Sequence, residues 1–147
     1  MNCAQSSNPL IRVPQERGPR ILVAIEYPVE ALAVESLLRS ESYHDVRVTT
    51  DLREIAPMYL RWPFHLLILD MHSKLMNGTT VMQNLTQPIS SSELKVLALL
   101  NPGAEQERLA ALAAGAIDTL SRPLNHESAL PRIRNALATS PVGISSF

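Results

Sequence analysis

Three side chains that could do chemistry follow short apolar stretches of the sequence. Glu26 directly follows ILVAI, Asp70 directly follows LLIL, and Arg122 lies two positions beyond AIDTL. Neighbouring carboxylates stay ionised most easily when a cation joins them, and Mg²⁺ typically takes one or two carboxylates and several waters. An arginine beside them can pair with a phosphoryl group. The alternative is that the acids are helix caps or solvated loop residues and that Arg122 lies on the surface.

Whether these groups meet depends on the elements that carry them. Five short apolar or alternating stretches predict β-strands at residues 21–25, 46–50, 66–69, 96–100 and 116–120. Five helical stretches alternate with them, at residues 28–39, 51–60, 78–87, 104–114 and 130–137. This alternation favours an α/β fold with a five-stranded, doubly wound parallel sheet. Ligands of such sheets bind at the carboxyl ends of the strands, which is where the three charged residues are predicted.

Several local signals set the predicted helix boundaries. Asp51 is a possible N-cap for the second helix, and Pro57 interrupts that helix. Gly115 stands where a C-cap belongs after the fourth helix, in which Leu109, Leu112 and Ala113 share one face. Pro131 lies within or near the start of the last helix, so we expect that helix to begin late or to bend.

The composition fits one globular domain between two tails. Of 147 residues, 46% are hydrophobic and 18% are charged, and the formal net charge is −1. Residues 1–19 and 140–147 read as tails and residues 20–139 as the domain. The balanced charge and the absence of a long apolar run predict neither direct nucleic-acid binding nor a membrane span. Cys3 is the only cysteine and no secretory signal is visible, which suits the cytoplasm.

Two segments in register resemble the receiver domain of bacterial two-component response regulators. LLILDMHSKLMNG is similar to the family's third strand and following loop, and AGAIDTLSRPL is similar to its fifth strand and the lysine–proline pair that follows. The resemblance covers residues 20–138. The spacing from Glu26 to Asp70, Leu100 and Arg122 fits the family's order of acidic pair, phospho-acceptor, hydroxyl residue and lysine.

The resemblance implies a chemistry for these positions. Asp70 would accept a phosphoryl group from a histidine kinase or phosphotransfer protein, and Mg²⁺ would stabilise the product. Glu26, Asp70 and the backbone carbonyl of His72 would hold the metal. The His72 side chain is not implicated, since a lone loop histidine is more often solvated. Arg122 would take the place of the family lysine, and its peptide bond to Pro123 is expected to be cis.

The sequence departs from the family pattern at several positions, which makes it an atypical member. Ile25 replaces the first acidic residue, and Leu100 replaces the hydroxyl residue that bonds the phosphoryl group. Thr119 stands at the aromatic switch position, and Lys74 replaces the loop proline. The usual switch pairs the hydroxyl with the aromatic ring. Any switch here would therefore take another route, through Lys74 or Arg122.

Two functions remain open, and a third is disfavoured. The chain is either a receiver that accepts phosphate on Asp70 or a pseudo-receiver that binds a partner whatever its phosphorylation state. The retained Asp70 favours the first, while Ile25 and Leu100 favour the second. An enzyme is not expected, because the sequence lacks the phosphate loop of a flavin binder, a GxGxxG motif and a nucleophile elbow.

The expected partners are proteins. A kinase or phosphotransfer protein would deliver the phosphoryl group, and a downstream protein would read the domain, which is either free-standing or part of a longer chain. Receivers commonly communicate through the face made by the fourth helix, fifth strand and fifth helix. Here this face would comprise residues 105–114, 116–120 and 130–137, and a homodimer could form on it.

Overall fold

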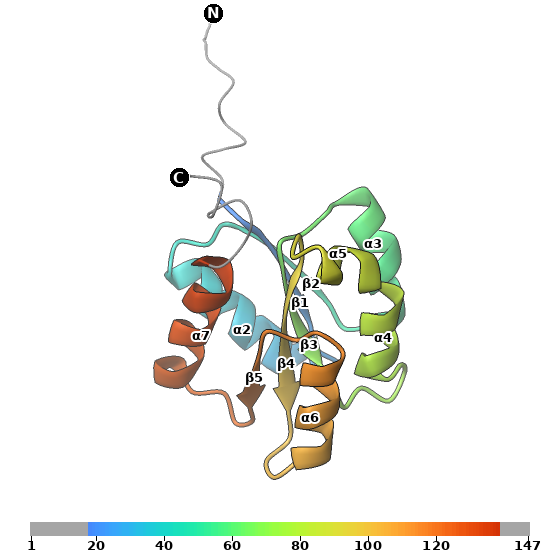
Figure 1. Cartoon of the computed structure of the whole chain (residues 1–147). Coiled ribbons are helices and arrows are strands. Elements are labelled where there is room, and N and C mark those ends of the chain that lie inside the picture. The colour runs from blue at the N-terminus through green and yellow to red at the C-terminus, as the bar shows by residue number, and fades with distance from the viewer. Residues whose placement is uncertain (1–17, 139–147) are drawn as a thin grey trace, which may run out of the picture.

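Five parallel strands form one sheet in the order β2-β1-β3-β4-β5 (Figure 1). The computed structural model describes residues 18–138, so both predicted tails lie almost wholly outside the described residues. The strands are β1 (Arg20–Ala24), β2 (Asp45–Thr49), β3 (Leu66–Asp70), β4 (Lys95–Leu100) and β5 (Asp118–Ser121). This confirms the predicted doubly wound α/β fold, with the chain reversing its direction of growth between β1 and β3.

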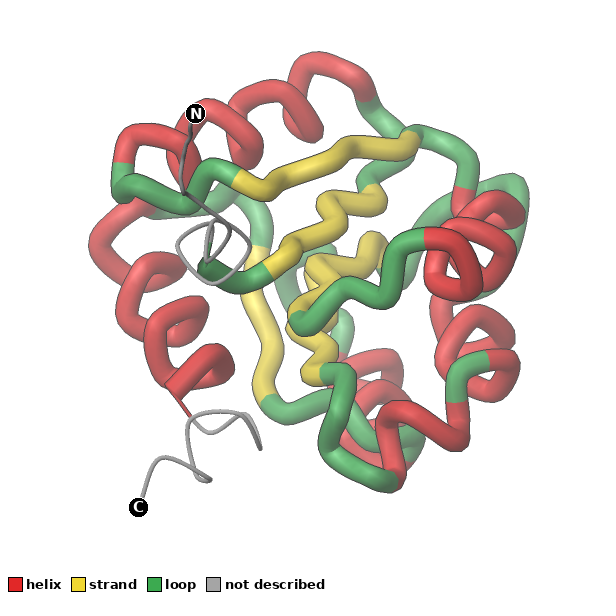
Figure 2. Tube along the Cα trace, turned by 90° about the horizontal axis from the view of Figure 1, so that it is seen from above, coloured by secondary structure: helices red, strands yellow, loops and turns green. Residues whose placement is uncertain are grey.

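Helices cover both faces of the sheet (Figure 2). They are α2 (Pro28–Ser40), the 3₁₀ turn η1 (Leu52–Glu54), α3 (Ile55–Arg61), α4 (Gly78–Asn84), α5 (Thr86–Ser90), α6 (Glu105–Ala113) and α7 (His126–Ala138). In Figure 1, α2 and α7 lie on one side of the sheet and α3 to α6 on the other. The continuous apolar runs of β1, β3 and β4 follow from this arrangement, because the inner strands of a sheet covered on both faces are buried on both sides.

The core divides into two layers, one on each face of the sheet. Successive residues of a strand point to opposite faces, so Leu67 and Leu69 pack toward α3, α4 and α6, while Leu66 and Ile68 pack toward α2 and α7. All four are fully buried. Two separate apolar layers therefore fix β3 at the centre of the sheet and carry Asp70 to its carboxyl edge.

All five predicted helices have different boundaries in the structure, although α2 differs only by one residue at its end. The stretch 51–60 divides into η1 and α3, and Asp51 caps η1 by accepting a hydrogen bond from the Arg53 amide. Pro57 does not interrupt α3, because it lies in the first turn, where its missing N–H needs no partner inside the helix. The stretch 78–87 also divides, into α4 and α5. The fourth helix, α6, begins one residue later than predicted, at Glu105.

The last helix was predicted to begin late or bend at Pro131, but α7 begins at His126 and contains the proline. Its start is explained by Asn125, whose side chain accepts a hydrogen bond from the Glu127 amide. The fifth strand begins at Asp118, two residues later than predicted, because Gly115 turns the chain with φ of 111°. None of the helices of residues 18–138 has the length and hydropathy that crossing a membrane requires.

Candidate functional site

The predicted acceptor, Asp70, is the last residue of β3 and has no solvent-exposed surface. Its Oδ1 accepts a hydrogen bond from the His72 amide at 2.9 Å, and its Oδ2 accepts one from the Glu26 amide at 3.2 Å. The Arg122 Nη2 lies 3.0 Å from the same Oδ2. A buried carboxylate is destabilising unless it is paired and hydrogen-bonded. These three contacts hold Asp70 as a buried anion at the edge of the sheet.

Arg122 directly follows β5, where its amide donates to the Leu100 carbonyl at 2.8 Å. Its peptide bond to Pro123 is cis, as expected. The guanidinium bonds both oxygens of Glu30, with Nε 2.9 Å from Oε2 and Nη2 3.0 Å from Oε1. Burial lowers the pKa of Arg122, but its hydrogen bonds to Glu30 and the charge of Asp70 outweigh this effect, so the pKa is raised on balance. Arg122 is therefore a permanent cation shared by two carboxylates.

Sequence reasoning missed two members of this network. Glu30, in the first turn of α2, is not among the residues that the sequence pattern singles out. Asn101, which follows β4, accepts a hydrogen bond from the Arg122 Nη1 at 2.9 Å. Glu30 and Arg122 are 92 positions apart in the chain. Only the topology could have indicated that Glu30 and Asn101 lie near Arg122, because the segments after β1, β4 and β5 all begin at the same edge of a parallel sheet.

Glu26 lies beside Asp70, but its carboxylate turns toward a different neighbour. Its amide donates to Asp70, whereas its Oε1 accepts a hydrogen bond from the Lys74 amide at 2.8 Å. Within residues 18–138, no hydrogen bond or ion pair joins this carboxylate to Arg122. Residues 26, 70 and 122 were predicted to lie together. Asp70 does contact Arg122 and the Glu26 amide, but the Glu26 carboxylate does not take part. The second acid on Arg122 is Glu30.

The donor set that sequence reasoning assigned to a metal consists of oxygen atoms from the ends of two neighbouring strands, with Glu26 after β1 and Asp70 and His72 at the end of β3. Asp70 and Glu26 both bond to amides of the β3–α4 loop, namely those of His72 and Lys74. Two carboxylates and the His72 carbonyl suit a hard cation such as Mg²⁺ that keeps several waters. The part of the chain that is described contains no group of three or more His, Cys, Asp and Glu side chains able to hold a metal. Waters and the carbonyl would have to complete the coordination.

The four positions at which the sequence departs from the expected pattern lie in different surroundings. Leu100 is 2% exposed and belongs to the apolar layer under α6, and Ile25 is fully buried in the opposite layer. Thr119 is half-buried in β5, and Lys74 is exposed. His72 is partly exposed, but its Nε2 is buried and has no hydrogen-bond partner among the described residues, so the ring is less solvated than expected.

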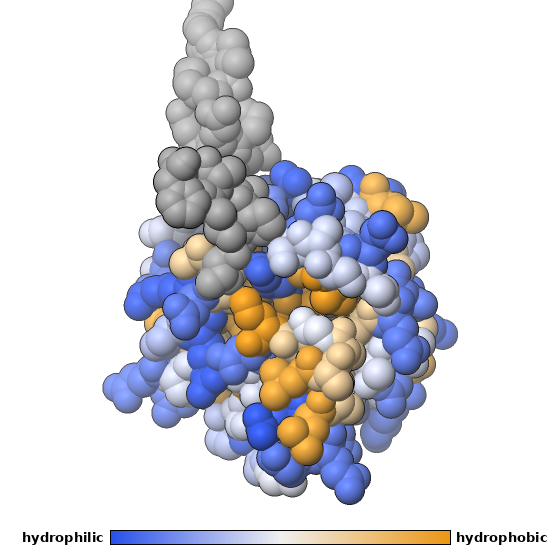
Figure 3. Space-filling view, in the orientation of Figure 1, coloured by the Kyte–Doolittle hydropathy of each residue, from blue (hydrophilic) through white to orange (hydrophobic). Residues whose placement is uncertain are grey.

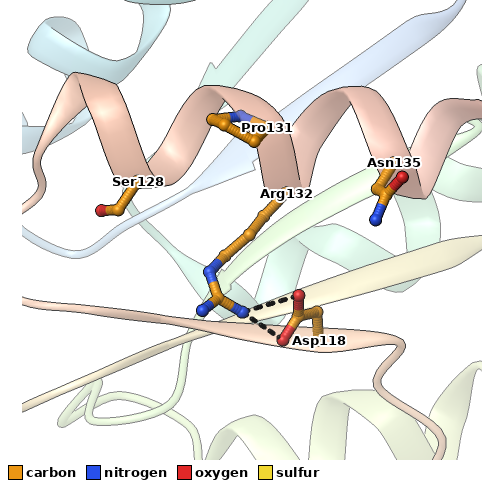
Figure 4. A pocket seen from close by; sticks show the side chains of 5 residues that line it. All are labelled: Asp118, Ser128, Pro131, Arg132 and Asn135. Atoms are coloured by element: carbon orange, nitrogen blue, oxygen red, sulfur yellow. Dashed lines mark hydrogen bonds and ion pairs between the residues drawn. The ribbon is translucent and has the colours of Figure 1, made fainter.

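A second concavity lies outside this site, between β5 and α7 (Figure 4). It has a volume of about 360 Å³ and is lined by Asp118, Ser128, Pro131, Arg132 and Asn135. The Arg132 Nη1 lies 2.7 Å from both carboxylate oxygens of Asp118. This ion pair connects α7 to β5 at Asp118, which directly precedes Thr119.

Comparison with known proteins gives a consistent family assignment. The sequence model of the response regulator receiver domain matches residues 21–134. No curated protein matches the chain. A protein assigned as a response regulator of Chloroflexus aurantiacus is 25% identical, with a TM-score of 0.76 over 82% of this chain and 98% of its own. The receiver domain of a sensor histidine kinase from Pseudomonas aeruginosa, which has a magnesium ion in its active-site cleft, is 20% identical, with a TM-score of 0.73 over 83% and 99%.

Proposed function

Because the chain belongs to the response regulator receiver domain family, we propose that it accepts a phosphoryl group on Asp70 and relays the signal by protein–protein contact. The donor is a histidine kinase or a phosphotransfer protein. The single observation that supports this assignment is the setting of Asp70. It is a completely buried carboxylate at the edge of the sheet, held by two backbone amides and one guanidinium.

The proposed step is an in-line transfer to one Asp70 oxygen. That oxygen attacks the phosphorus of the donor phosphohistidine, the P–N bond breaks, and its electron pair stays on the imidazole nitrogen, which takes up a proton. The protein orients the nucleophile through the Glu26 and His72 amides, and the Arg122 guanidinium offsets charge on the phosphoryl oxygens. Glu26, Asp70 and the His72 carbonyl would hold Mg²⁺, which would supply further positive charge at those oxygens.

The alternative is a pseudo-receiver that binds its partner whatever the state of Asp70. Two observations favour it. Leu100 lies in the apolar core and offers no hydroxyl to a phosphoryl group, and the Arg122 guanidinium is already paired with Glu30 and Asn101. In this case the Asp70–Arg122 pair would serve to stabilise the edge of the sheet.

Incubation with a small phosphodonor and Mg²⁺ separates the two functions. We expect the intact mass to rise by one phosphoryl group in the wild type and not in Asp70→Asn. Asp118→Asn is the matched control, since it removes a half-buried carboxylate that also lies on the sheet but is paired with Arg132. An unchanged wild-type mass, with no spectroscopic response to beryllofluoride and Mg²⁺, would favour the pseudo-receiver.

We propose the face of α6, β5 and α7 as the surface that relays the signal, with a second copy of the chain as a partner. The leucine face of α6 does not pack on the sheet. Leu109 is 53% exposed, and Leu112 and Ile117 are each 37% exposed, while the small Ala111 covers the core. Figure 3 shows an apolar patch over this region. Exposed apolar side chains grouped in this way are typical of an interaction surface.

A further inference from the structure

The guanidinium of Arg122 has two edges, each with two nitrogen atoms, and the structure uses them differently. The Nε–Nη2 edge bonds the Glu30 carboxylate in a bidentate pair. The Nη1–Nη2 edge faces the acceptor, with Nη2 3.0 Å from the Asp70 Oδ2 and Nη1 2.9 Å from the Asn101 Oδ1. Of the five N–H groups, four are therefore engaged. The orientation of the whole plane follows from the Glu30 contact, because a bidentate pair fixes a planar group more firmly than a single bond does.

Among the described residues, only the Asp70–Arg122 pair is more buried than the Glu30–Arg122 pair. Its side chains are 24% and 15% exposed, whereas every surface pair, such as Arg108–Glu105, has at least one partner that is 36% exposed or more. Solvent screens an exposed pair strongly and a half-buried pair much less. The pair also joins two elements that are distant in the sequence, the first turn of α2 and the segment after β5. It therefore determines where the guanidinium lies.

We propose that Glu30 is a positioning residue, which holds one edge of Arg122 and thereby presents the other edge to the phosphoryl group on Asp70. This inference deepens the proposed function and rests on it. It also gives a reason for an arginine at this position. A lysine ammonium is a single point charge with rotatable donors, so it cannot be oriented on one side by Glu30 while it presents a fixed pair of donors on the other.

Phosphorylation would change the contacts of the guanidinium edge that faces Asp70, where the bond to Asn101 is the weaker one. Asn101 is neutral and exposed, so its bond to Nη1 is more easily replaced than the charged bond to Glu30. Phosphoryl oxygens on Asp70 would take over Nη1 and the Nη2 hydrogen that faces Asp70, while Glu30 keeps Nε and the other Nη2 hydrogen. The phosphorylated site would then remain connected to the first turn of α2 through Glu30. This route requires neither a hydroxyl at Leu100 nor an aromatic ring at Thr119.

The test is a titration with beryllofluoride and Mg²⁺, followed by NMR, of the wild type, Glu30→Ala, Glu30→Gln and Glu127→Gln. Glu127 is the matched control, because it is an exposed acid in the first turn of α7, a helix of 13 residues like α2. We expect Glu30→Ala to weaken binding about tenfold, since the bidentate contact that orients the guanidinium toward Asp70 is lost. Glu30→Gln keeps one acceptor oxygen and should lie between that variant and the wild type. Glu127→Gln should bind as the wild type does.

A second readout needs no phosphoryl analogue. The Arg122 Nε–H resonance should exchange slowly with water in the wild type and in Glu127→Gln, and rapidly in Glu30→Ala. If the wild-type protein does not bind beryllofluoride but its Arg122 Nε–H resonance is protected from exchange, the proposed function is wrong and the positioning of Arg122 by Glu30 is supported. If Glu30→Ala binds beryllofluoride as tightly as the wild type or more tightly, or if its Nε–H stays protected, Glu30 does not position Arg122. Circular dichroism of each variant establishes that it is folded.

Discussion

At the scale of single residues, the site is governed by how a buried negative charge is compensated. Asp70 and Glu30 both lie against one guanidinium, and two backbone amides contribute the remaining contacts to Asp70. Breaking such a buried pair by removing one partner leaves an uncompensated charge, which is far more costly than losing a surface ion pair. This explains why the arginine, which cannot lose its proton, suits the position.

Leu100 provides a residue-scale test of the missing hydroxyl. We expect Leu100→Thr to lengthen the lifetime of the phosphorylated form about tenfold, because a hydroxyl could then donate to the phosphoryl oxygens. It should also cost about 2–4 kcal/mol of stability, since the side chain is smaller and polar in an apolar layer. The lifetime is measured by the decay of the phosphorylated mass.

Leu99→Thr is the control for this test, because Leu99 is fully buried but packs in the opposite layer, toward α2 and α7. It should lose similar stability with no gain in lifetime. Equal lifetimes for all three proteins would mean that the carboxyl end of β4 does not contact the phosphoryl group.

His65 gives a prediction of pH dependence. Its Nδ1 accepts a hydrogen bond from the Arg20 amide at 3.0 Å, which requires the neutral ring. Burial, together with the charge of Arg20, lowers the pKa of His65 in the folded protein, although Asp45 acts in the opposite direction. The unfolded chain therefore binds a proton more readily. This contribution to stability is complete above the unfolded pKa of about 6.5 and is lost as the pH falls toward the lower folded value.

Urea unfolding at pH 7.5 and pH 5.5 measures this effect. The midpoint should fall less with acidification in His65→Asn, whose Oδ1 keeps an acceptor near the position of Nδ1. His126→Asn removes an exposed histidine and should keep the wild-type pH dependence. An identical loss in wild type and His65→Asn would assign the effect to other groups.

At the scale of elements, the site depends on how closely the segments after the strands approach one another. Gly78, the first residue of α4, lies so near β3 that an added Cβ would come within 2.6 Å of the Met71 Sδ. The helix thereby starts directly beside Asp70 and turns the loop from His72 to Asn77 back over the sheet edge. The same loop supplies the amides that bond Asp70 and Glu26.

Gly115 tests the turn that leads into β5 and so to Arg122. Its φ is 111°, and an added Cβ would lie 2.6 Å from the Ile89 Cγ2. We expect Gly115→Ala to lower the free energy of unfolding by about 2–4 kcal/mol, from backbone strain and overpacking together. Urea denaturation followed by circular dichroism measures the loss.

Gly103→Ala is the matched variant, since Gly103 has φ of 75° with no atom within 4 Å of an added Cβ. Its loss should be confined to backbone strain, about 1 kcal/mol. Equal losses in the two variants would show that the contact with Ile89 relaxes without cost.

At the scale of the whole molecule, the segments that follow β1, β3, β4 and β5 all lie at one edge of the parallel sheet and form the candidate site. The exposed apolar side chains of α6 and of the segment leading into β5 form a separate face. If two copies associate through this face, Leu109→Ser should weaken self-association without changing the melting temperature, because Leu109 is exposed. Sedimentation equilibrium of the phosphodonor-treated protein measures it. Leu60→Ser, which alters a leucine that is 84% exposed on α3, should leave association unchanged. A wild type that stays monomeric at high concentration excludes this face as a dimer interface.

The architecture and the position of Asp70 at the sheet edge could be predicted from the sequence, because they depend on local and repeating signals. Continuous apolar runs indicate strands buried on both faces, and an acid at the end of the central run lies at the ligand-binding edge of the sheet. The exact helix starts were less predictable, since α7 depends on the Asn125 cap and tolerates Pro131. The two leucines of α6, Leu109 and Leu112, have the spacing of a buried face. Both are exposed, because Ala111 is the residue of this helix that contacts the core.

Only the tertiary structure decided which acid pairs with Arg122. The printed sequence places Glu26 next to the first strand, and the simplest reading brings its carboxylate to the guanidinium. The folded chain turns that carboxylate to the Lys74 amide and brings Glu30 to Arg122 across 92 positions. The positions of strands and helices can be read from local patterns, but a side-chain partner depends on angles and distances between elements that no local pattern encodes.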